Sequence, residues 1–185
     1  MTTEINQLIN WRANQALAEL DLVSSETHRF AMRHFAAGVS ILTTGDGQER
    51  AGLTASAVVS VTADPPRLVA FVNKNVAAAE LIMRHGNLCV NVLADDQEET
   101  GRAFAGMIKD IHGPARFGYG DWGELVSGAP ALAGSLALFD TRVVKIFDES
   151  THYACLCEVL ATRERPSATP LLYFNGSFHR LRDIA

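Results

Sequence analysis

Short apolar runs separated by turn-forming residues constrain the fold of this chain more than any other feature. Each run is rich in β-branched and aromatic residues and is short enough for a single strand. Glycine, proline and aspartate separate the runs, as at residues 45–47 and 64–66. The predicted strands cover residues 39–44, 57–62, 68–73, 87–93, 141–147, 152–161 and 171–175. Many strands with few helices predict a mainly β protein, a closed or partly closed barrel with peripheral helices.

The N-terminal part of the chain is predicted to be helical. In residues 4–20 apolar side chains recur at roughly helical spacing, which predicts an amphipathic helix. A second helix is predicted over residues 26–37, with Ser25 as its N-cap and Gly38 as its C-cap. The first helix packs either on its own domain or on another subunit or partner, and the sequence leaves both arrangements open.

Two more helices are predicted between the strands. Asn75 suits the N-cap of a short helix over residues 76–84, which Gly86 ends. The acidic residues at 95–99 open another helix, where negative charge is favourable near the N-terminal dipole. We interpret that acidic run as helix electrostatics and predict no metal site, because nothing nearby completes a coordination set. Glycine and proline make residues 106–134 mostly loop.

Composition excludes several classes of protein. The 185 residues are 48% hydrophobic and 20% charged, which is typical of one soluble globular domain. We expect a helical extension at residues 1–25 and a single domain at residues 26–185. The net charge of −5 argues against a nucleic-acid partner, and no apolar stretch is long enough to predict a membrane span. No secretory signal is recognisable, so a cytoplasmic location is expected.

The three cysteines are predicted to be buried, inert thiols. Cys155 and Cys157 are two residues apart in an apolar run, so they would share one face of a strand. Their spacing differs from the C-x-x-C of redox and zinc motifs. Together with Cys89 they make an odd number of thiols, which fits a reducing compartment.

Some motifs fail when their context is considered. Residues 118–123 match G-x-G-x-x-G, but that motif binds a dinucleotide only between a buried strand and a helix. A Gly/Pro-rich segment precedes it and Pro130 follows soon after, so neither element is expected. The six histidines are scattered without metal-ligand spacing. The residues alone therefore indicate no catalytic constellation and no metal centre.

One hydroxyl-rich segment at residues 52–62 stands out. Thr54, Ser56, Ser60 and Thr62 occupy even positions, so they would share one face if the segment stays extended. The small residues beside them let a ligand approach the backbone closely. Such a face suits a ribityl chain, a phosphate or the polar edge of a planar heterocycle. An exposed Ser/Thr-rich strand face explains the same pattern, and periodicity alone favours that alternative.

Blocks of sequence, taken in order, carry a resemblance to a known family. They comprise residues 30–44, 52–62, 64–66, 88–93, 102–106, 128–134, 150–152, 171–174 and 178–179. In this order they resemble the short-chain flavin reductases, the reductase components of two-component flavin-dependent monooxygenases such as the 4-hydroxyphenylacetate 3-monooxygenase type. The resemblance extends from about residue 28 to the end of the chain. It implies the FMN-binding split β-barrel, which has Greek-key-like connections.

The resemblance also implies a set of cofactor-binding residues. The implied flavin contacts are Thr54, Ala55, Ser56, Ala57, Ser60, Val61, Thr62, Phe71, Val72, Asn73, Asn75 and Ala77. His152 matches the histidine that the family places near the nicotinamide, and Tyr173 and Phe178 are candidates for the same wall. The chain has Ser150 where the family often has glycine, and alanine at 57 and 77 where hydroxyls are common. The last two differences affect the expected phosphate contacts.

The implied activity is hydride transfer from NADH or NADPH to FMN or FAD. Reduced flavin then leaves for a separate monooxygenase, and the family forms homodimers with flavin near the subunit interface. No catalytic acid or base is predicted, because the flavin itself carries the chemistry. A flavin-bound electron-transfer protein and a non-catalytic flavin-binding barrel are the alternatives. The 185 residues are too few for a flavin domain and a dinucleotide domain of ~100–150 residues each, so donor and acceptor would share one cleft.

Overall fold

The structure is a computed structural model that describes residue 17 and residues 19–181. Contacts divide the chain into two compact units, residues 1–35 and residues 36–185. The predicted helix over residues 4–20 lies almost wholly outside the described residues. Within those residues, no helix is both long and apolar enough to cross a membrane.

The first unit contains helix α3, Ser25–Met32, which is shorter than the predicted helix over residues 26–37. Its N-cap is Ser24 rather than Ser25, and the Ser24 hydroxyl accepts a hydrogen bond from the Thr27 amide at 3.1 Å. The predicted C-cap at Gly38 was wrong. Gly38 lies in strand β1, where it pairs with Leu172.

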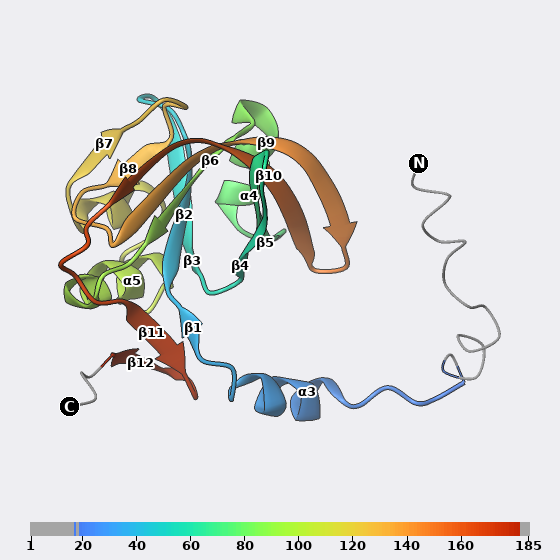
Figure 1. The fold of residues 1–185 in the computed structure, drawn as a ribbon. Helices are drawn as coiled ribbons and strands as arrows, with labels where there is room; N and C mark the ends of the chain where they lie inside the picture. The colour runs from blue at the N-terminus through green and yellow to red at the C-terminus, as the bar shows by residue number, and fades with distance from the viewer. Residues whose placement is uncertain (1–16, 18, 182–185) are drawn as a thin grey trace. The chain divides into compact units, whose positions relative to one another are not determined.

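The second unit is built on a seven-stranded antiparallel sheet with the order β3-β2-β6-β9-β10-β5-β4 (Figure 1). Its strands are β2 (Ser40–Gly45), β3 (Arg50–Ala55), β4 (Val58–Ala63), β5 (Pro66–Asn73), β6 (Asn87–Val92), β9 (Ala137–Glu149) and β10 (His152–Glu164). Two small sheets accompany it, β1-β11-β12 and β7-β8. Their strands are β1 (Ala37–Gly38), β11 (Leu171–Phe174), β12 (Ser177–Arg180), β7 (Trp122–Glu124) and β8 (Pro130–Leu132). The prediction of a mainly β protein with peripheral helices is confirmed.

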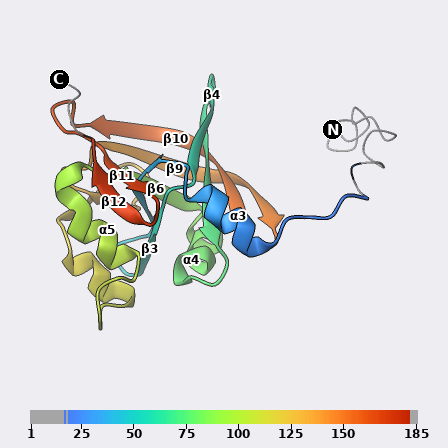
Figure 2. The same ribbon diagram turned by 90° about the horizontal axis from the view of Figure 1, so that it is seen from below.

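The two edge strands of the large sheet are consecutive in the chain. β3 and β4 lie at opposite ends of the strand order, yet only Ser56 and Ala57 separate them. Three residue steps span at most about 11 Å, so the ends of these strands lie close together. The sheet therefore curls into a barrel whose two edges meet at this two-residue link, which we call the seam. Figure 2 shows β4 running steeply across the direction of β10, and β5 lies between these two strands in the sheet order.

The seam corrects one prediction from the sequence. Residues 52–62 do not form one extended strand, because the two halves pair with different neighbours. Ala55 pairs with Ser40 of β2, whereas Val58 pairs with Ala70 of β5. A bulge between Ser60 and Thr62 disturbs the alternation further. The predicted single face of hydroxyls is therefore divided between two edges of the barrel.

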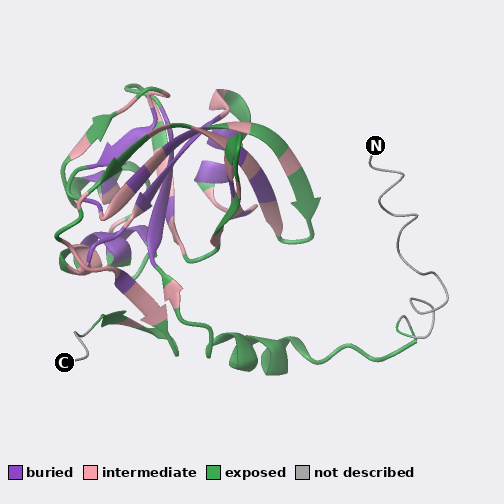
Figure 3. Ribbon diagram, in the orientation of Figure 1, coloured by how far each residue is buried: buried purple, intermediate pink, exposed green. Residues whose placement is uncertain are grey.

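The barrel interior holds the main hydrophobic core. All six residues of β2 are buried, as Figure 3 shows for the central strands. Helix α4 (Ala77–His85) packs Ala78, Ala79 and Ile82 into this core. Gly86 ends the helix with a left-handed φ of 65°, as predicted. The predicted N-cap was wrong: Val76 occupies that position, and Asn75 instead donates its backbone N–H to the Asn73 side chain at 2.9 Å.

A second core lies under the irregular segment after residue 105. It includes helix α5 (Glu98–Phe104), which follows a 3₁₀ turn at Asp95–Gln97, and a second 3₁₀ segment at Gly113–Gly118. Phe104, Phe117 and Trp122 pack together with ring centroids 4.9–5.2 Å apart. The G-x-G-x-x-G match thus begins at the end of a 3₁₀ turn and runs into β7, without the helix that dinucleotide binding requires.

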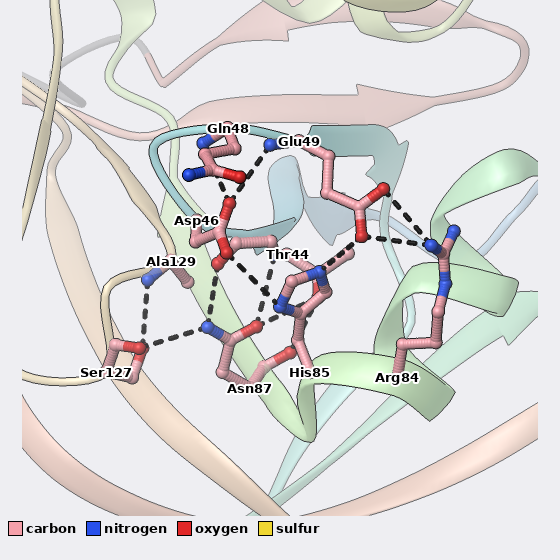
Figure 4. A network of polar contacts seen from close by, with 10 residues as sticks. Thr44, Asp46, Gln48, Glu49, Arg84, His85, Asn87, Ser127 and Ala129 are labelled. Carbon is pink, nitrogen blue, oxygen red and sulfur yellow. Dashed lines mark hydrogen bonds and ion pairs between the residues drawn. The ribbon is translucent and has the colours of Figure 1, made fainter.

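A polar network fastens the β2–β3 turn to its surroundings (Figure 4). The buried Asn87 side chain donates to the carbonyls of Gly45 and Ser127 at 2.8 and 3.0 Å, and it accepts from the Gly45 amide at 3.1 Å. In the same turn, Glu49 accepts hydrogen bonds from Arg84 at 3.0 Å and lies 2.9 Å from His85 Nε2. The turn, the end of α4 and the loop before β8 are therefore held together.

The three cysteines are unpaired and buried, as predicted. Cys155 and Cys157 share the inner face of β10. Burial raises the pKa of Cys89 and Cys157 to about 12 and that of Cys155 to about 11, because a thiolate loses its hydration in the core.

Candidate flavin and nicotinamide site

A cavity of about 400 Å³ opens at the seam of the barrel, and we call it the seam cavity. It is lined by Leu53, Thr54, Ala55, Ser56, Ala57, Phe71, Asn73, Val76, Phe104, Ala105, Arg116 and His152. These residues come from β3, the two-residue link, β5, β10, the start of α4, the end of α5 and the second 3₁₀ segment. The volume lies within the ~300–1,000 Å³ usual for cofactor pockets.

The seam cavity brings together seven of the residues that the resemblance implies. Thr54–Ala57 supply the seam itself, and Phe71, Asn73 and His152 reach it from β5 and β10. Alternation along β5 explains which of its residues take part: Leu68, Ala70 and Val72 are buried, while Phe71 and Asn73 face the other side. Val72 has no exposed surface and packs in the core. Its predicted contact would therefore use the backbone.

A second, smaller cavity adjoins the first. This aromatic cavity measures about 220 Å³ and is lined by Val39, Thr54, Ala55, Ser56, Ala105, Met107, Tyr173 and Phe178. Tyr173 and Phe178 face each other across the β11–β12 hairpin with ring centroids 5.3 Å apart. The two cavities share Thr54, Ala55, Ser56 and Ala105, so they are adjacent, and we call the two together the cleft.

The remaining predicted residues lie outside this cleft. Ser60 and Thr62 line a third cavity of about 610 Å³, which we call the barrel cavity and which has mostly apolar walls. Ser56 borders all three cavities. Val61 is 54% exposed on β4. Asn75 and Ala77 are exposed beside Val76, which does line the seam cavity.

Hydrogen bonds fix the orientation of several groups in the cleft. The Thr54 hydroxyl donates to the Gly101 carbonyl at 2.7 Å, which ties the end of β3 to α5. His152 Nδ1 lies 2.8 Å from the Thr151 hydroxyl, so Nε2 is the ring nitrogen left for a ligand. Thr54 can still accept a hydrogen bond through its second lone pair.

Arg116 is the one charged residue of the cleft that sequence reasoning missed. Its Nη1 makes long contacts of 3.4 Å with the carbonyls of Gly52 and Phe104, and its buried Nε has no hydrogen-bond partner. Phe104 and Ala105 were also absent from the predicted contacts, although they fall in a block that carries the resemblance. For Arg116, which stands in a Gly/Pro-rich loop, no local pattern indicated a role.

The composition of the cleft fits a flavin. Phe71, Phe104 and Leu53 provide apolar surface for a planar ring, and hydroxyls and backbone groups at the seam suit a ribityl chain. Arg116 adds a positive charge to the wall, and no carboxylate lines either part of the cleft. Such a surface accepts a ligand with an apolar ring and a polar, anionic tail.

Comparison with known proteins identifies the family. The family model described as flavin reductase like domain matches residues 32–182. FMN reductase (NADH) RutF of Ancylobacter novellus is 38% identical over 166 residues, which cover 90% of each chain. The 4-hydroxyphenylacetate 3-monooxygenase reductase component of Pseudomonas aeruginosa is 38% identical over 157 residues, which cover 85% of this chain and 92% of that protein.

Solved structures agree with the sequence relatives. The NADH:FAD oxidoreductase SgcE6 of Streptomyces globisporus C-1027, in complex with NAD and FAD fragments, has a TM-score of 0.79 at 28% identity and covers 90% of this chain and 99% of its own. Flavin reductase PheA2 in its native state has a TM-score of 0.79 at 27% identity and covers 87% of this chain and all of its own. These likenesses confirm the predicted split barrel. With a family match that spans nearly all of its second compact unit, the chain belongs to the flavin reductase-like family.

Proposed function

We propose that the cleft seats flavin and nicotinamide together, so that this flavin reductase transfers hydride from NADH to free flavin and releases the reduced product. The observation that carries the proposal is the seam cavity. It collects Thr54–Ala57, Phe71, Asn73 and His152 from strands that are distant in sequence. The adjoining aromatic cavity extends the same wall with Tyr173 and Phe178.

Each part of the cleft has a distinct task in this proposal. The seam supplies backbone groups and the hydroxyls of Thr54 and Ser56 to the flavin, and Phe71 packs beside its ring. His152 positions the nicotinamide through Nε2, while the Tyr173–Phe178 pair closes the wall. The bound flavin supplies the hydride-accepting chemistry, so the protein needs to hold the reactants about 3–3.5 Å apart and exclude water.

The relatives guide the identity of both reactants. RutF of Ancylobacter novellus is named an FMN reductase that uses NADH, and SgcE6 is named an NADH:FAD oxidoreductase. We therefore propose NADH as the hydride donor and FMN or FAD as the acceptor. Since the relative from Pseudomonas aeruginosa is a monooxygenase reductase component, we also propose a separate monooxygenase as the recipient of reduced flavin.

A homodimer and a cytoplasmic location complete the proposal, with residues 26–185 as the reductase domain. The edge strand β4 exposes Val59 and Val61, which are 58% and 54% accessible in the single chain. An exposed apolar edge strand is usually covered by another chain, which favours self-association. Light scattering should give twice the mass of one chain, whereas a monomer at micromolar concentration would contradict the dimer. The three unpaired thiols favour a reducing compartment.

The function is tested by following NADH oxidation while free FMN or FAD is increased. A diffusible-flavin reductase turns over the added flavin and saturates with it. A rate of NADH oxidation that is independent of added flavin but requires a protein acceptor would identify an electron-transfer protein instead. Flavin binding without NADH oxidation would identify a non-catalytic barrel.

A further inference from the structure

Arg116 lies on the wall of the seam cavity, together with the seam residues and His152. Its guanidinium reaches this position from the second 3₁₀ segment, far from β3 and β5 in sequence. The backbone around it is well anchored, because its neighbour Phe117 is buried and makes edge contacts with Phe104 and Trp122. The backbone that carries Arg116 is therefore held in place before any ligand arrives.

The guanidinium of Arg116 has no anionic partner in the part of the chain that the structure describes. Arg102 and Arg165, by contrast, form ion pairs with the carboxylates of Glu98 and Asp96. Arg116 has only two 3.4 Å contacts from Nη1 to backbone carbonyls, and its buried Nε lacks any partner. A buried donor without a partner is costly, and an acceptor that reached the guanidinium would relieve that cost.

The charge of the cleft differs from that of the whole protein. The chain carries 21 acidic and 16 basic residues, yet no Asp or Glu lines the seam cavity or the aromatic cavity. The titratable side chains lining them are Arg116, His152 and Tyr173. A site of this kind in an acidic protein concentrates anions.

We propose that Arg116 binds a phosphate group in the cleft, either the ribityl phosphate of the flavin or the pyrophosphate of NADH. A guanidinium recognises both through charge-assisted hydrogen bonds. The inference rests on the proposed function, since it deepens the assignment of that same site. Arg116 would also replace phosphate contacts that Ala57 and Ala77 cannot make, because these positions lack the hydroxyls that are common in the family.

The first test compares ligands that differ only in the phosphate. FMN and riboflavin are titrated into the protein by fluorescence, without NADH, so that the result does not depend on turnover. If Arg116 binds the flavin phosphate, Arg116→Gln should weaken FMN binding by about 10- to 100-fold and leave riboflavin unchanged, because a charged hydrogen bond is lost. Arg116→Lys should restore part of the FMN affinity. Arg142→Gln removes an exposed partner of Glu158 away from the cleft and serves as the matched control.

The second test addresses the dinucleotide. With riboflavin as the acceptor, the KM for NADH is compared with that for 1-benzyl-1,4-dihydronicotinamide, which has no phosphate. A rise in KM confined to NADH in Arg116→Gln assigns the arginine to the pyrophosphate, and a loss confined to FMN assigns it to the flavin. The inference is wrong if Arg116→Gln changes the binding of none of these ligands. It is also wrong if the variant weakens FMN and riboflavin equally and NADH and 1-benzyl-1,4-dihydronicotinamide equally. A wild-type protein that oxidises no NADH with any flavin would instead overturn the proposed function, while the FMN–riboflavin titration would still decide the role of Arg116.

Discussion

His152 and Asn73 are direct cross-strand partners, at the point where β10 begins and β5 ends. Directly paired residues of an antiparallel sheet present their side chains on the same face, with Cβ atoms about 4.5–5.5 Å apart. Both side chains line the seam cavity. In the proposed site, the residue that contacts the nicotinamide and one that contacts the flavin ring are thus neighbours on a regular β-ladder.

Replacing His152 should impair the use of NADH more than the binding of flavin. His152→Ala removes the Nε2 group while the β5–β10 pairing persists through backbone hydrogen bonds. We expect kcat/KM for NADH to fall by about 10- to 100-fold, as for the loss of one or two positioning contacts. The FMN dissociation constant should stay within about twofold.

Thr151→Val is the control for that experiment. It removes the hydroxyl that lies 2.8 Å from His152 Nδ1 but keeps the imidazole, so its effect should be smaller. An unchanged NADH dependence in His152→Ala would remove this histidine from the nicotinamide site.

The two seam hydroxyls should behave differently when deleted. The Ser56 hydroxyl makes no hydrogen bond within the described chain, so Ser56→Ala should weaken flavin binding by roughly 1–3 kcal/mol without lowering Tm. Thr54→Val also breaks the bond to the Gly101 carbonyl and should lower both affinity and Tm. Flavin titration and thermal unfolding of both variants check this. Equal affinity in Ser56→Ala and wild type would mean that the seam hydroxyl does not touch the flavin.

Gly52 should tolerate no side chain. A Cβ at this position would lie 2.7 Å from Phe104 Cε1 and 3.0 Å from the Leu42 carbonyl oxygen. Gly52→Ala should therefore reduce the free energy of unfolding by about 1–3 kcal/mol, as overpacking does. Gly47→Ala, in the turn of the same hairpin, has only a contact at 3.9 Å and should be nearly neutral. Chemical denaturation of both variants compares them, and equal stabilities would show that Phe104 gives way.

Local patterns predicted the elements whose signals are local. The short apolar run at residues 68–73 predicted β5, and Gly86 marked the end of α4 because a left-handed C-cap favours glycine. The β11–β12 hairpin could also have been found, since Asn175-Gly176 at its turn is a strong hairpin signal. These features depend on a few neighbouring residues.

The features that were missed depend on contacts between distant residues. The break at Ser56 arises because Ala55 and Val58 pair with different strands, which no window of sequence reveals. Arg116 enters the cleft because the packing of Phe117 against Phe104 carries its loop there. The family resemblance supplied most of the seam residues, and the fold was needed to show that they line one cavity.

The buried thiols predict a pH dependence of stability. Their pKa is about 11–12 in the folded chain and about 8.5 in an unfolded one, so the unfolded state loses its protons first. Their contribution to stability is complete below about pH 8.5 and declines as the pH rises toward 11. Urea denaturation from pH 7 to 10 should show this decline, and a Cys89→Ala, Cys155→Ala, Cys157→Ala triple variant should show less of it. Rapid alkylation by iodoacetamide in the native protein at pH 8 would contradict the burial.

The central claim is that one cleft of a single small barrel brings nicotinamide and flavin into contact. Anaerobic stopped-flow mixing of the protein–FMN complex with NADH measures this directly through the loss of flavin absorbance. The account predicts a single-turnover loss whose rate saturates with NADH and is slower with NADH deuterated at C4. A bound flavin that stays oxidised, or that is reduced no faster than free FMN, would contradict it.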